Sequence, residues 1–172
     1  MNIYTLGPAG TNCEKAANQY MEKQHWSGQV KLRETLEVAL EDLLSSPEPG
    51  ILMGCIVYPH LHELVFRHLD CLKLVDHHLM DTHDMVFAKN QGQTINRIGS
   101  HPAPVSLLAQ LEDLGSSPDV VLCTSNSEAA LQCAQGSIDA CITTLAAAHA
   151  NKLNITRNFG PVPMGFSIHL KV

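Results

Sequence analysis

Small hydroxyl and amide side chains gather in four short turns, each lying where an apolar segment ends and an amphipathic segment begins. The turns are GPAGTN at 7–12, SHPAP at 100–104, TSNS at 124–127 and TT at 143–144. A helix N-terminus presents unpaired backbone N–H groups and the positive end of the helix dipole, so such turns hold carboxylates and phosphates. Capping of the helix by the same side chains is the alternative interpretation of each turn taken alone.

Ten histidines are many for a chain of this length, and His101 inside the SHPAP turn is the one that we expect to take part in chemistry. The others include two local clusters, at His60/His62 and at His77/His78/His83. A metal site needs ligands that converge in space. No H-E-x-x-H motif occurs, so we expect surface or capping histidines and no metal.

Other reactive motifs are absent or weak. No G-x-S-x-G nucleophile motif occurs, and GPAG is neither a P-loop nor a dinucleotide fingerprint. Cys13 begins a predicted helix, where the pKa of a thiol falls. It also lies on the apolar stripe of that helix, which favours buried packing instead. We expect no cofactor.

Strand-like and helix-like segments alternate along the chain. Continuous or alternating apolar runs predict strands at 2–6, 29–32, 51–57, 71–79, 85–88, 95–99, 120–123, 138–142 and 164–172. Apolar residues at helical spacing predict helices around 13–21, 36–44, 60–68, 103–114 and 127–135, and one from Thr144 onward. This alternation is typical of α/β layers with mostly parallel sheets. The chain divides into two similar halves of three strand–helix steps each.

Composition narrows the class of protein. The 172 residues are 45% apolar and 16% charged, with a net charge of −6, which excludes a disordered chain. No basic footprint for nucleic acid is visible, and no apolar run is long enough to span a bilayer. The N-terminus shows no secretory signal, and the six cysteines form no C-x-x-C pair. We therefore expect a cytoplasmic globular protein with free thiols.

Five segments, taken in order, resemble the prephenate dehydratase domain over almost the whole chain. They are TLGPAGTNCEKAA, SHPAPVSLLAQ, TSNSEAA, DACITTLAAAHANKL and PMGFSIHL. The resemblance implies an α/β, two-lobed fold like the type II periplasmic binding proteins, with prephenate in an interlobe cleft. The lobes would comprise 1–76 plus 161–172 and 77–160. No regulatory domain follows in this sequence, so we expect no feedback through one.

Two departures from the dehydratase pattern matter for the reaction. Dehydratases carry a Thr-Arg-Phe triplet where this chain has Met164, Gly165 and Phe166, and a Pro-Ile-Glu-Asn-Ser segment where it has residues 58–62, YPHLH. The missing Thr and Arg are the groups expected to help expel the ring hydroxyl of prephenate. Neither Met nor Gly donates a strong hydrogen bond or carries positive charge.

The departures resemble the non-aromatising prephenate decarboxylases of antibiotic pathways, the bacilysin type. The matching pieces are Tyr58-Pro59-His60 for a Val-Pro-His segment, the pair Asp81-Thr82, Ser100 to Pro104 for SHP-x-P, and Pro163 to Ser167 for Pro-Met-x-x-Ser. The resemblance implies a lyase that removes CO2 from prephenate, protonates the ring and keeps the 4-hydroxyl, giving dihydro-4-hydroxyphenylpyruvate. A dehydratase giving phenylpyruvate and a non-catalytic prephenate-binding protein are the alternatives.

From this resemblance we expect His60 or His101 to donate the proton. The expected substrate-binding residues are Thr11, Asn12, Asp81, Thr82, Ser100, Thr124, Ser125, Asn126, Ser127, Thr143, Met164 and Phe166. Met164 and Phe166 would form an apolar wall, and the hydroxyl-rich helix N-termini would bind the tail carboxylate. The expected partner is one small dianionic substrate, with neither nucleic acid nor membrane, and a homodimer stays open.

Overall fold

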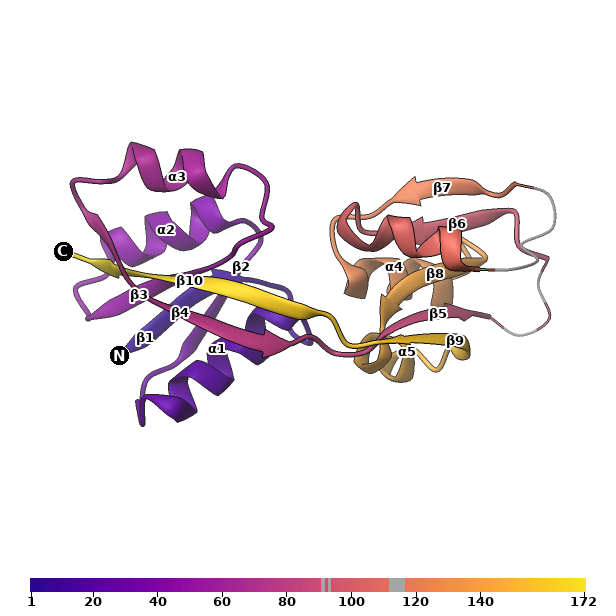
Figure 1. The fold of residues 1–172 in the computed structure, drawn as a ribbon, viewed down its shortest axis with the longest axis horizontal. Helices are drawn as coiled ribbons and strands as arrows, with labels where there is room; N and C mark the ends of the chain where they lie inside the picture. Colours follow the sequence, from indigo (N-terminus) through magenta and orange to yellow (C-terminus); the bar gives the residue numbers. More distant parts are fainter. Residues whose placement is uncertain (91, 93, 112–116) are drawn as a thin grey trace. The chain divides into compact units, whose positions relative to one another are not determined.

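Two five-stranded sheets, each with helices on both faces, make up the chain (Figure 1). The computed structural model describes residues 1–90, 92, 94–111 and 117–172. One unit comprises Met1–Asp81 with Pro163–Val172, and the other comprises Thr82–Val162. The expected two-lobed α/β class is confirmed. The first unit extends to Asp81 rather than to residue 76, because its last strand before the division stays paired as far as that residue.

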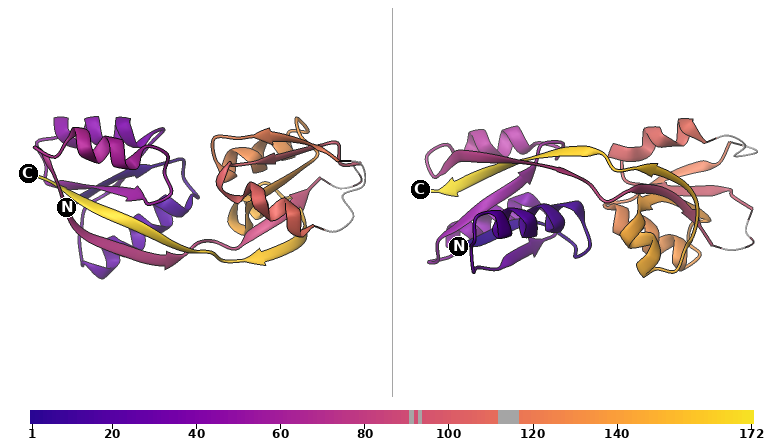
Figure 2. Two further views of the ribbon diagram at one scale, coloured as in Figure 1. Left: turned by 45° about the horizontal axis from the view of Figure 1, so that its top comes forward. Right: turned by 60° about the horizontal axis from the view of Figure 1, so that its bottom comes forward.

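The first sheet has the strand order β2-β1-β3-β10-β4. Its strands are β1 Asn2–Leu6, β2 Val30–Arg33, β3 Gly50–Cys55, β4 Leu72–Asp81 and β10 Pro163–Lys171. Helix α1 Asn12–Lys23 covers one face, and α2 Leu36–Ser45 and α3 Leu61–Arg67 lie on the other (Figure 2). Strands β1, β2 and β3 are parallel, while β10 is antiparallel to both of its neighbours.

Alternation along the strands divides the core of the first unit into two layers, because successive side chains point to opposite faces. The layer under α1 contains Ile3, Ile51, Met53, Phe166 and Ile168 from the sheet, packed on Cys13, Ala16, Ala17 and Tyr20. The layer under α2 and α3 contains Tyr4, Leu52 and Leu72, packed on Leu36, Ala39, Leu40, Leu43 and Leu64. The helical stripes predicted from the sequence therefore face the sheet.

The second sheet has the order β7-β6-β8-β5-β9. Its strands are β5 Met85–Lys89, β6 Arg97–Ser100, β7 Asp119–Leu122, β8 Ala140–Thr144 and β9 Asn154–Gly160. Helices α4 Asn126–Ala134 and α5 Leu145–Ala150 pack on one face, and the 3₁₀ helix η1 Ala103–Gln110 packs on the other. The order repeats that of the first sheet, with an antiparallel strand, β5 here and β10 there, in the fourth position.

Several sequence-based expectations are corrected. The sheets are mixed rather than mostly parallel, since β5 and β10 each pair antiparallel on both sides. Strand β10 has buried residues on both faces, Phe166 and Ile168 on one and Gly165 and His169 on the other. The expected helix 103–114 is a 3₁₀ helix as far as Gln110, and residues 112–114 lie outside the described residues. Strand β9 was not expected, because NITRNFG lacks a clear apolar alternation.

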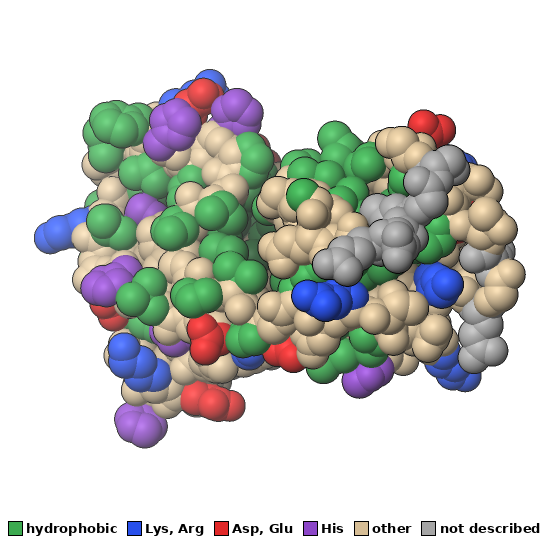
Figure 3. All heavy atoms as spheres, turned by 45° about the vertical axis from the view of Figure 1, so that its right-hand side comes forward, with side chains coloured by type: hydrophobic (Ala, Val, Ile, Leu, Met, Phe, Trp, Pro, Cys, Tyr) green, Lys and Arg blue, Asp and Glu red, His purple; other side chains and the backbone are tan. Residues whose placement is uncertain are grey.

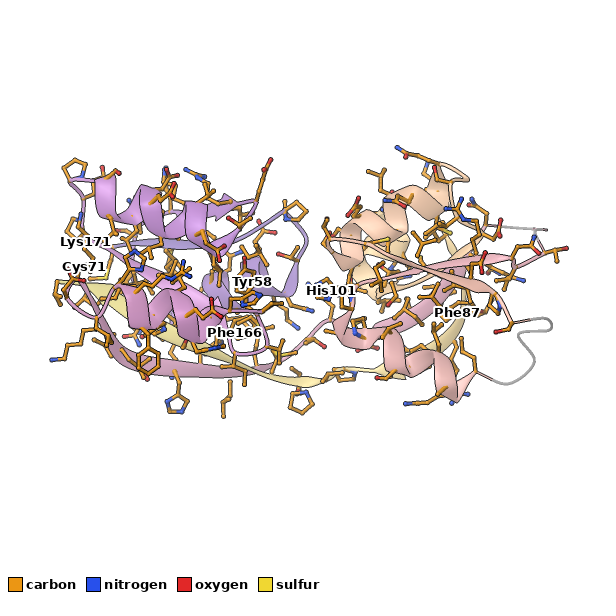
Figure 4. All side chains as sticks on the ribbon, turned by 90° about the horizontal axis from the view of Figure 1, so that it is seen from above. Tyr58, Cys71, Phe87, His101, Phe166 and Lys171 are labelled. Atoms are coloured by element: carbon orange, nitrogen blue, oxygen red, sulfur yellow. The ribbon has the colours of Figure 1, made fainter. Side chains whose placement is uncertain are left out.

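The end of β10 is joined to the end of α2 by one side chain. Lys171 Nζ donates hydrogen bonds to the carbonyl oxygens of Leu43, Leu44 and Ser46 at 3.2, 2.8 and 2.8 Å (Figure 4 labels Lys171). The last carbonyls of a helix have no partner within the helix and carry its negative dipole end, so an ammonium group there is stabilising.

Lys171→Met keeps the aliphatic stem and removes these hydrogen bonds, so we expect it to lower the free energy of unfolding by about 1 kcal/mol. Lys73→Met, at an exposed lysine on β4, is the matched control and should change it by less than about 0.5 kcal/mol. Urea unfolding followed by circular dichroism measures both values. Equal destabilisation by the two variants would contradict the capping role.

Candidate functional site

In the first unit the expected site residues lie at one edge of the sheet. Parallel strands end at the same edge, so the turn after β1 and the turn after β3 both lie there. Antiparallel β10 begins at this edge, where Met164 pairs with Met80 and Phe166 with Cys55. Thr11, Asn12, His60, Asp81 and Met164 therefore belong to elements that meet at the carboxyl ends of β1, β3 and β4.

The second unit repeats this arrangement. Ser100 is the last residue of β6 and His101 follows it, the residues 124–127 follow β7, and Thr143 is the next-to-last residue of β8. Strand β5 begins at the same edge, because Met85 pairs with Thr144. Thr82 lies just before β5 and joins the end of the unit, since its backbone N–H donates to Val162 O and its hydroxyl accepts from Val162 N. Each unit thus collects its share of the candidate residues on one edge.

The hydroxyl turns cap helices, as the alternative interpretation expected. Thr11, Ser125 and Thr144 are the N-cap residues of α1, α4 and α5, and each side-chain oxygen accepts a backbone N–H from its helix. Glu14 Oε2 also accepts the Gly10 N–H at 2.6 Å, and Glu128 Oε2 accepts the Thr124 N–H at 2.7 Å. These are variants of the capping box, because the third helical residue folds back but accepts the N–H of the residue before the N-cap.

The capping boxes matter for binding because they place the protein's own carboxylates at two helix N-termini. Hydrogen bonds from Thr124 also hold the pKa of Glu128 below its ordinary value, so that side chain is ionised at neutral pH. A substrate carboxylate therefore meets N–H groups at Gly10 and Thr124 that already have an anionic acceptor.

His101 lies in the turn between β6 and η1, and is half-buried (Figure 4). Its Nδ1 accepts the backbone N–H of Ala103 at 3.2 Å, so the proton of the neutral ring is on Nε2. Burial lowers the pKa of this imidazole below its ordinary value of 6.5. The ring is therefore mainly neutral at pH 7 in the free protein and gains a proton more readily when an anion binds nearby.

His60 is exposed and precedes α3 with a left-handed backbone, at φ 64° and ψ 10°. Side chains with a Cβ rarely adopt this conformation, and where it persists the surrounding structure imposes it. Two residues earlier, the hydroxyl of Tyr58 donates to Glu37 Oε2 at 2.8 Å and accepts from Leu36 N at 3.4 Å. The His60 ring contacts Glu63, with Nδ1 3.2 Å from Oε1.

Four of the expected substrate-binding residues are buried. Ser100, Thr143 and Phe166 are fully buried, and Thr82 is 4% exposed. The hydroxyl of Ser100 donates to His101 O and that of Thr143 to Asn126 O. Phe166 is a core residue under α1 rather than part of an exposed wall (Figure 4). These side chains lie within the protein at this edge, and their role in substrate binding stays a prediction.

An apolar surface lies directly over Gly165. A Cβ added there would be 2.8 Å from Ile56 Cδ1 and 3.4 Å from Leu79 Cδ2. Ile56 is 60% exposed and Leu79 71% exposed, so two large hydrophobic side chains flank the glycine and face solvent. Exposed hydrophobic side chains cover much of the first unit (Figure 3). In the dehydratase pattern that the sequence resembles, an arginine occupies the position of Gly165.

The remaining reactive groups do not form a second site. Burial raises the pKa of the Cys13 thiol to about 12, which confirms packing rather than nucleophilic chemistry. All six cysteines carry free thiols. Among the described residues no group of three or more His, Cys, Asp or Glu side chains is placed to hold a metal ion. No helix in the described part of the chain is long and apolar enough to cross a membrane.

Three features of the site were not predicted from the sequence. The spacing of Thr11 and Glu14, repeated in Ser125 and Glu128, is the signature of a capping box and could have been found. The pair Ile56 and Leu79 has no sequence signal, because it forms only when β3, β4 and β10 lie side by side. The closeness of the first turn of α1 to the end of β4 was missed for the same reason.

The chain is similar to known proteins both in sequence and in structure. No family model matches it. A curated prephenate decarboxylase of Bacillus subtilis is 27% identical over 98% of this chain and 85% of its own length, and one of Bacillus amyloliquefaciens is 25% identical with the same coverage. The crystal structure of a prephenate dehydratase from Arthrobacter aurescens superposes with a TM-score of 0.77 at 19% identity. It covers all of this chain, which spans 61% of that protein's length.

The structural similarity supports the fold, and the sequence similarity is to the decarboxylases. Both agree with the resemblance carried by the five motifs, which is confirmed. The chain is similar over nearly its whole length to prephenate decarboxylases, and it has the fold of a prephenate dehydratase.

Proposed function

We propose that this protein is a prephenate decarboxylase. The bond between the ring carbon and its carboxylate breaks, CO2 leaves, the electron pair shifts a ring double bond, and one proton adds to a ring carbon. The 4-hydroxyl stays, and the product is a dihydro-4-hydroxyphenylpyruvate.

The observation that carries this proposal is the apolar surface at Gly165. Expelling hydroxide needs an acid or a cation beside the 4-hydroxyl, and one positioned acid contributes about 10²–10⁴-fold. Met164 and Gly165 supply neither, and the space over Gly165 is filled by Ile56 and Leu79. Loss of CO2 instead benefits from a dry, apolar contact for the carboxylate, because the charge disperses as the bond breaks.

We propose His101 as the proton donor, with His60 as the competing candidate. A donor must hold a proton when the substrate is bound. The two carboxylates of the substrate would raise the lowered pKa of His101 by attraction, so binding itself would charge the ring. His60 is more exposed, which fits a role in binding.

The dehydratase and the non-catalytic binding protein are the two alternatives. The dehydratase would give phenylpyruvate, and the binding protein would give no product. We propose a cytoplasmic location, which the free thiols fit. The proposed substrate is a small dianion. We infer no oligomeric state.

Incubation of the purified protein with prephenate should yield dihydro-4-hydroxyphenylpyruvate and CO2. Because prephenate aromatises in acid, the reaction is run above pH 7.5 beside a protein-free blank, and the product is identified by NMR and ultraviolet spectra. Phenylpyruvate above the blank would favour the dehydratase. Binding without consumption of prephenate would favour the non-catalytic protein.

His101→Ala should lower kcat by about 10²–10⁴-fold, while His60→Ala should mainly raise KM. If the imidazolium of His101 is the acid, kcat/KM of the unmodified protein falls as pH rises through the pKa of the free enzyme, which lies below 6.5. His101→Ala should lose this limb, and His60→Ala should retain it. The assignment to His101 fails if His60→Ala alone loses the limb.

Met164→Thr with Gly165→Arg should divert part of the product to phenylpyruvate, provided that Ile56→Ala is added to make room for the new side chain. The same triple change with Gly165→Gln, which has similar size and no charge, is the matched control and should give no phenylpyruvate. Product ratios measured by chromatography test this. Equal ratios from the Arg and Gln variants would show that charge at position 165 does not decide the outcome.

A further inference from the structure

A cavity of about 340 Å³ opens on the first unit, on the face of the sheet where α2 packs over β1. Its lining comes from Tyr4 on β1, Lys31 and Arg33 on β2, Asp42 near the end of α2, and the segment 46–48 that follows α2. Cavities that bind small ligands begin at about 300 Å³. None of the expected substrate-binding residues lines this cavity, so it is separate from the candidate site.

Tyr4 forms the buried floor of this cavity. Its side chain packs under α2, and the residue is only 5% exposed. The hydroxyl has no hydrogen-bond partner among the described residues, and it is not one of the fully enclosed polar atoms that lack a partner. A tyrosine hydroxyl in a buried position normally finds a partner. The unused hydroxyl therefore opens to the cavity, from which a ligand can reach it.

Two opposite charges line the same cavity, and each has only a neutral partner. Lys31 Nζ donates to Gln29 Oε1 at 2.5 Å, and Glu48 Oε2 accepts from Asn2 Nδ2 at 2.5 Å. In the described part of the chain neither charged side chain forms an ion pair. The two amide residues are joined in turn, since Gln29 N donates to Asn2 Oδ1 at 2.9 Å. One ammonium group and one carboxylate are thus held near each other without neutralising each other.

The other charges around the cavity are already paired. Arg33 Nε forms an ion pair with Asp42, and Arg33 Nη1 donates to Leu32 O at 2.7 Å. Lys171 occupies the last carbonyls of α2, so the negative end of that helix is also satisfied. Selection of a ligand by charge therefore falls to Lys31 and Glu48.

We propose that this cavity binds a free α-amino acid through its zwitterionic backbone. The Lys31 ammonium group and the Tyr4 hydroxyl bind the ligand carboxylate, because these two residues pair directly on neighbouring strands. The Glu48 carboxylate binds the ligand ammonium group. A ligand with a single charge meets one attractive and one repulsive group in the same cavity, so it binds more weakly than a zwitterion. This inference does not depend on the proposed decarboxylation.

L-Leucine and two molecules that keep its carbon skeleton but lack one charge test this proposal. Isocaproate lacks the ammonium group, and isoamylamine lacks the carboxylate. We expect leucine to bind at neutral pH at least about 10-fold more tightly than either, as measured by NMR titration of the full chain. Equal binding of isocaproate and leucine would contradict recognition of a zwitterion. Absence of leucine binding up to about 10 mM overturns the proposal.

Variants then locate the binding. Tyr4→Phe removes one hydrogen bond to a charged group and should weaken leucine binding about 10-fold. Lys31→Met and Glu48→Gln each remove one charge and should weaken it by at least as much. Tyr20→Phe is the matched control and should leave the Kd unchanged, because Tyr20 is a buried tyrosine in the layer under α1, on the other face of the sheet. Circular dichroism shows whether each variant is folded. Unchanged affinity in all three cavity variants would place leucine elsewhere and overturn the proposal.

Discussion

The pairing of β10 between β3 and β4 is the constraint on which the first unit depends. Nine residues near the end of the chain enter a sheet whose other strands lie before residue 82, and they contribute Phe166 and Ile168 to the core layer under α1. The same pairing brings Met164 and Gly165 to the edge where β3 and β4 end. The chemistry of that edge is therefore set by the strand that also closes the fold. A substitution in its first residues acts on the site, whereas one in its last residues, such as Lys171, acts on stability.

Electrostatics at the two edges differ from what the turns alone suggest. Helix N-termini attract anions, but here Glu14 and Glu128 already accept N–H groups from the turns. Their carboxylates stabilise the helices and leave less of the dipole for a ligand. An anionic substrate bound at these edges would have to displace a glutamate or bind beside it, and the second course requires a cation nearby.

Much of the fold could be predicted from the sequence, because local patterns determine it. The helical stripe of Cys13, Ala16, Ala17 and Tyr20 faces the sheet, and the apolar run at 51–57 forms most of β3, which ends at Cys55. The mixed character of the sheets could not be predicted, since strand direction depends on the return of β10 from far along the chain. The sequence located the candidate turns but did not predict the burial of Ser100 and Thr143. A serine or threonine in a turn has the same sequence pattern whether it caps a helix, packs in the core or binds a ligand.

Placing a glycine opposite two exposed hydrophobic side chains has a cost as well as a use. Exposed Ile56 and Leu79 gain nothing from burial in the free protein, and an exposed apolar surface is unfavourable in water. A bound ring system would cover them and recover part of that free energy, about 25 cal/mol for each Å² of apolar area removed from water. Covering the surface also expels water from the departing carboxylate, which destabilises the charged group that is lost. The same apolar contact can therefore contribute to binding of the ring and to loss of CO2, provided that the retained carboxylate is held by charge elsewhere.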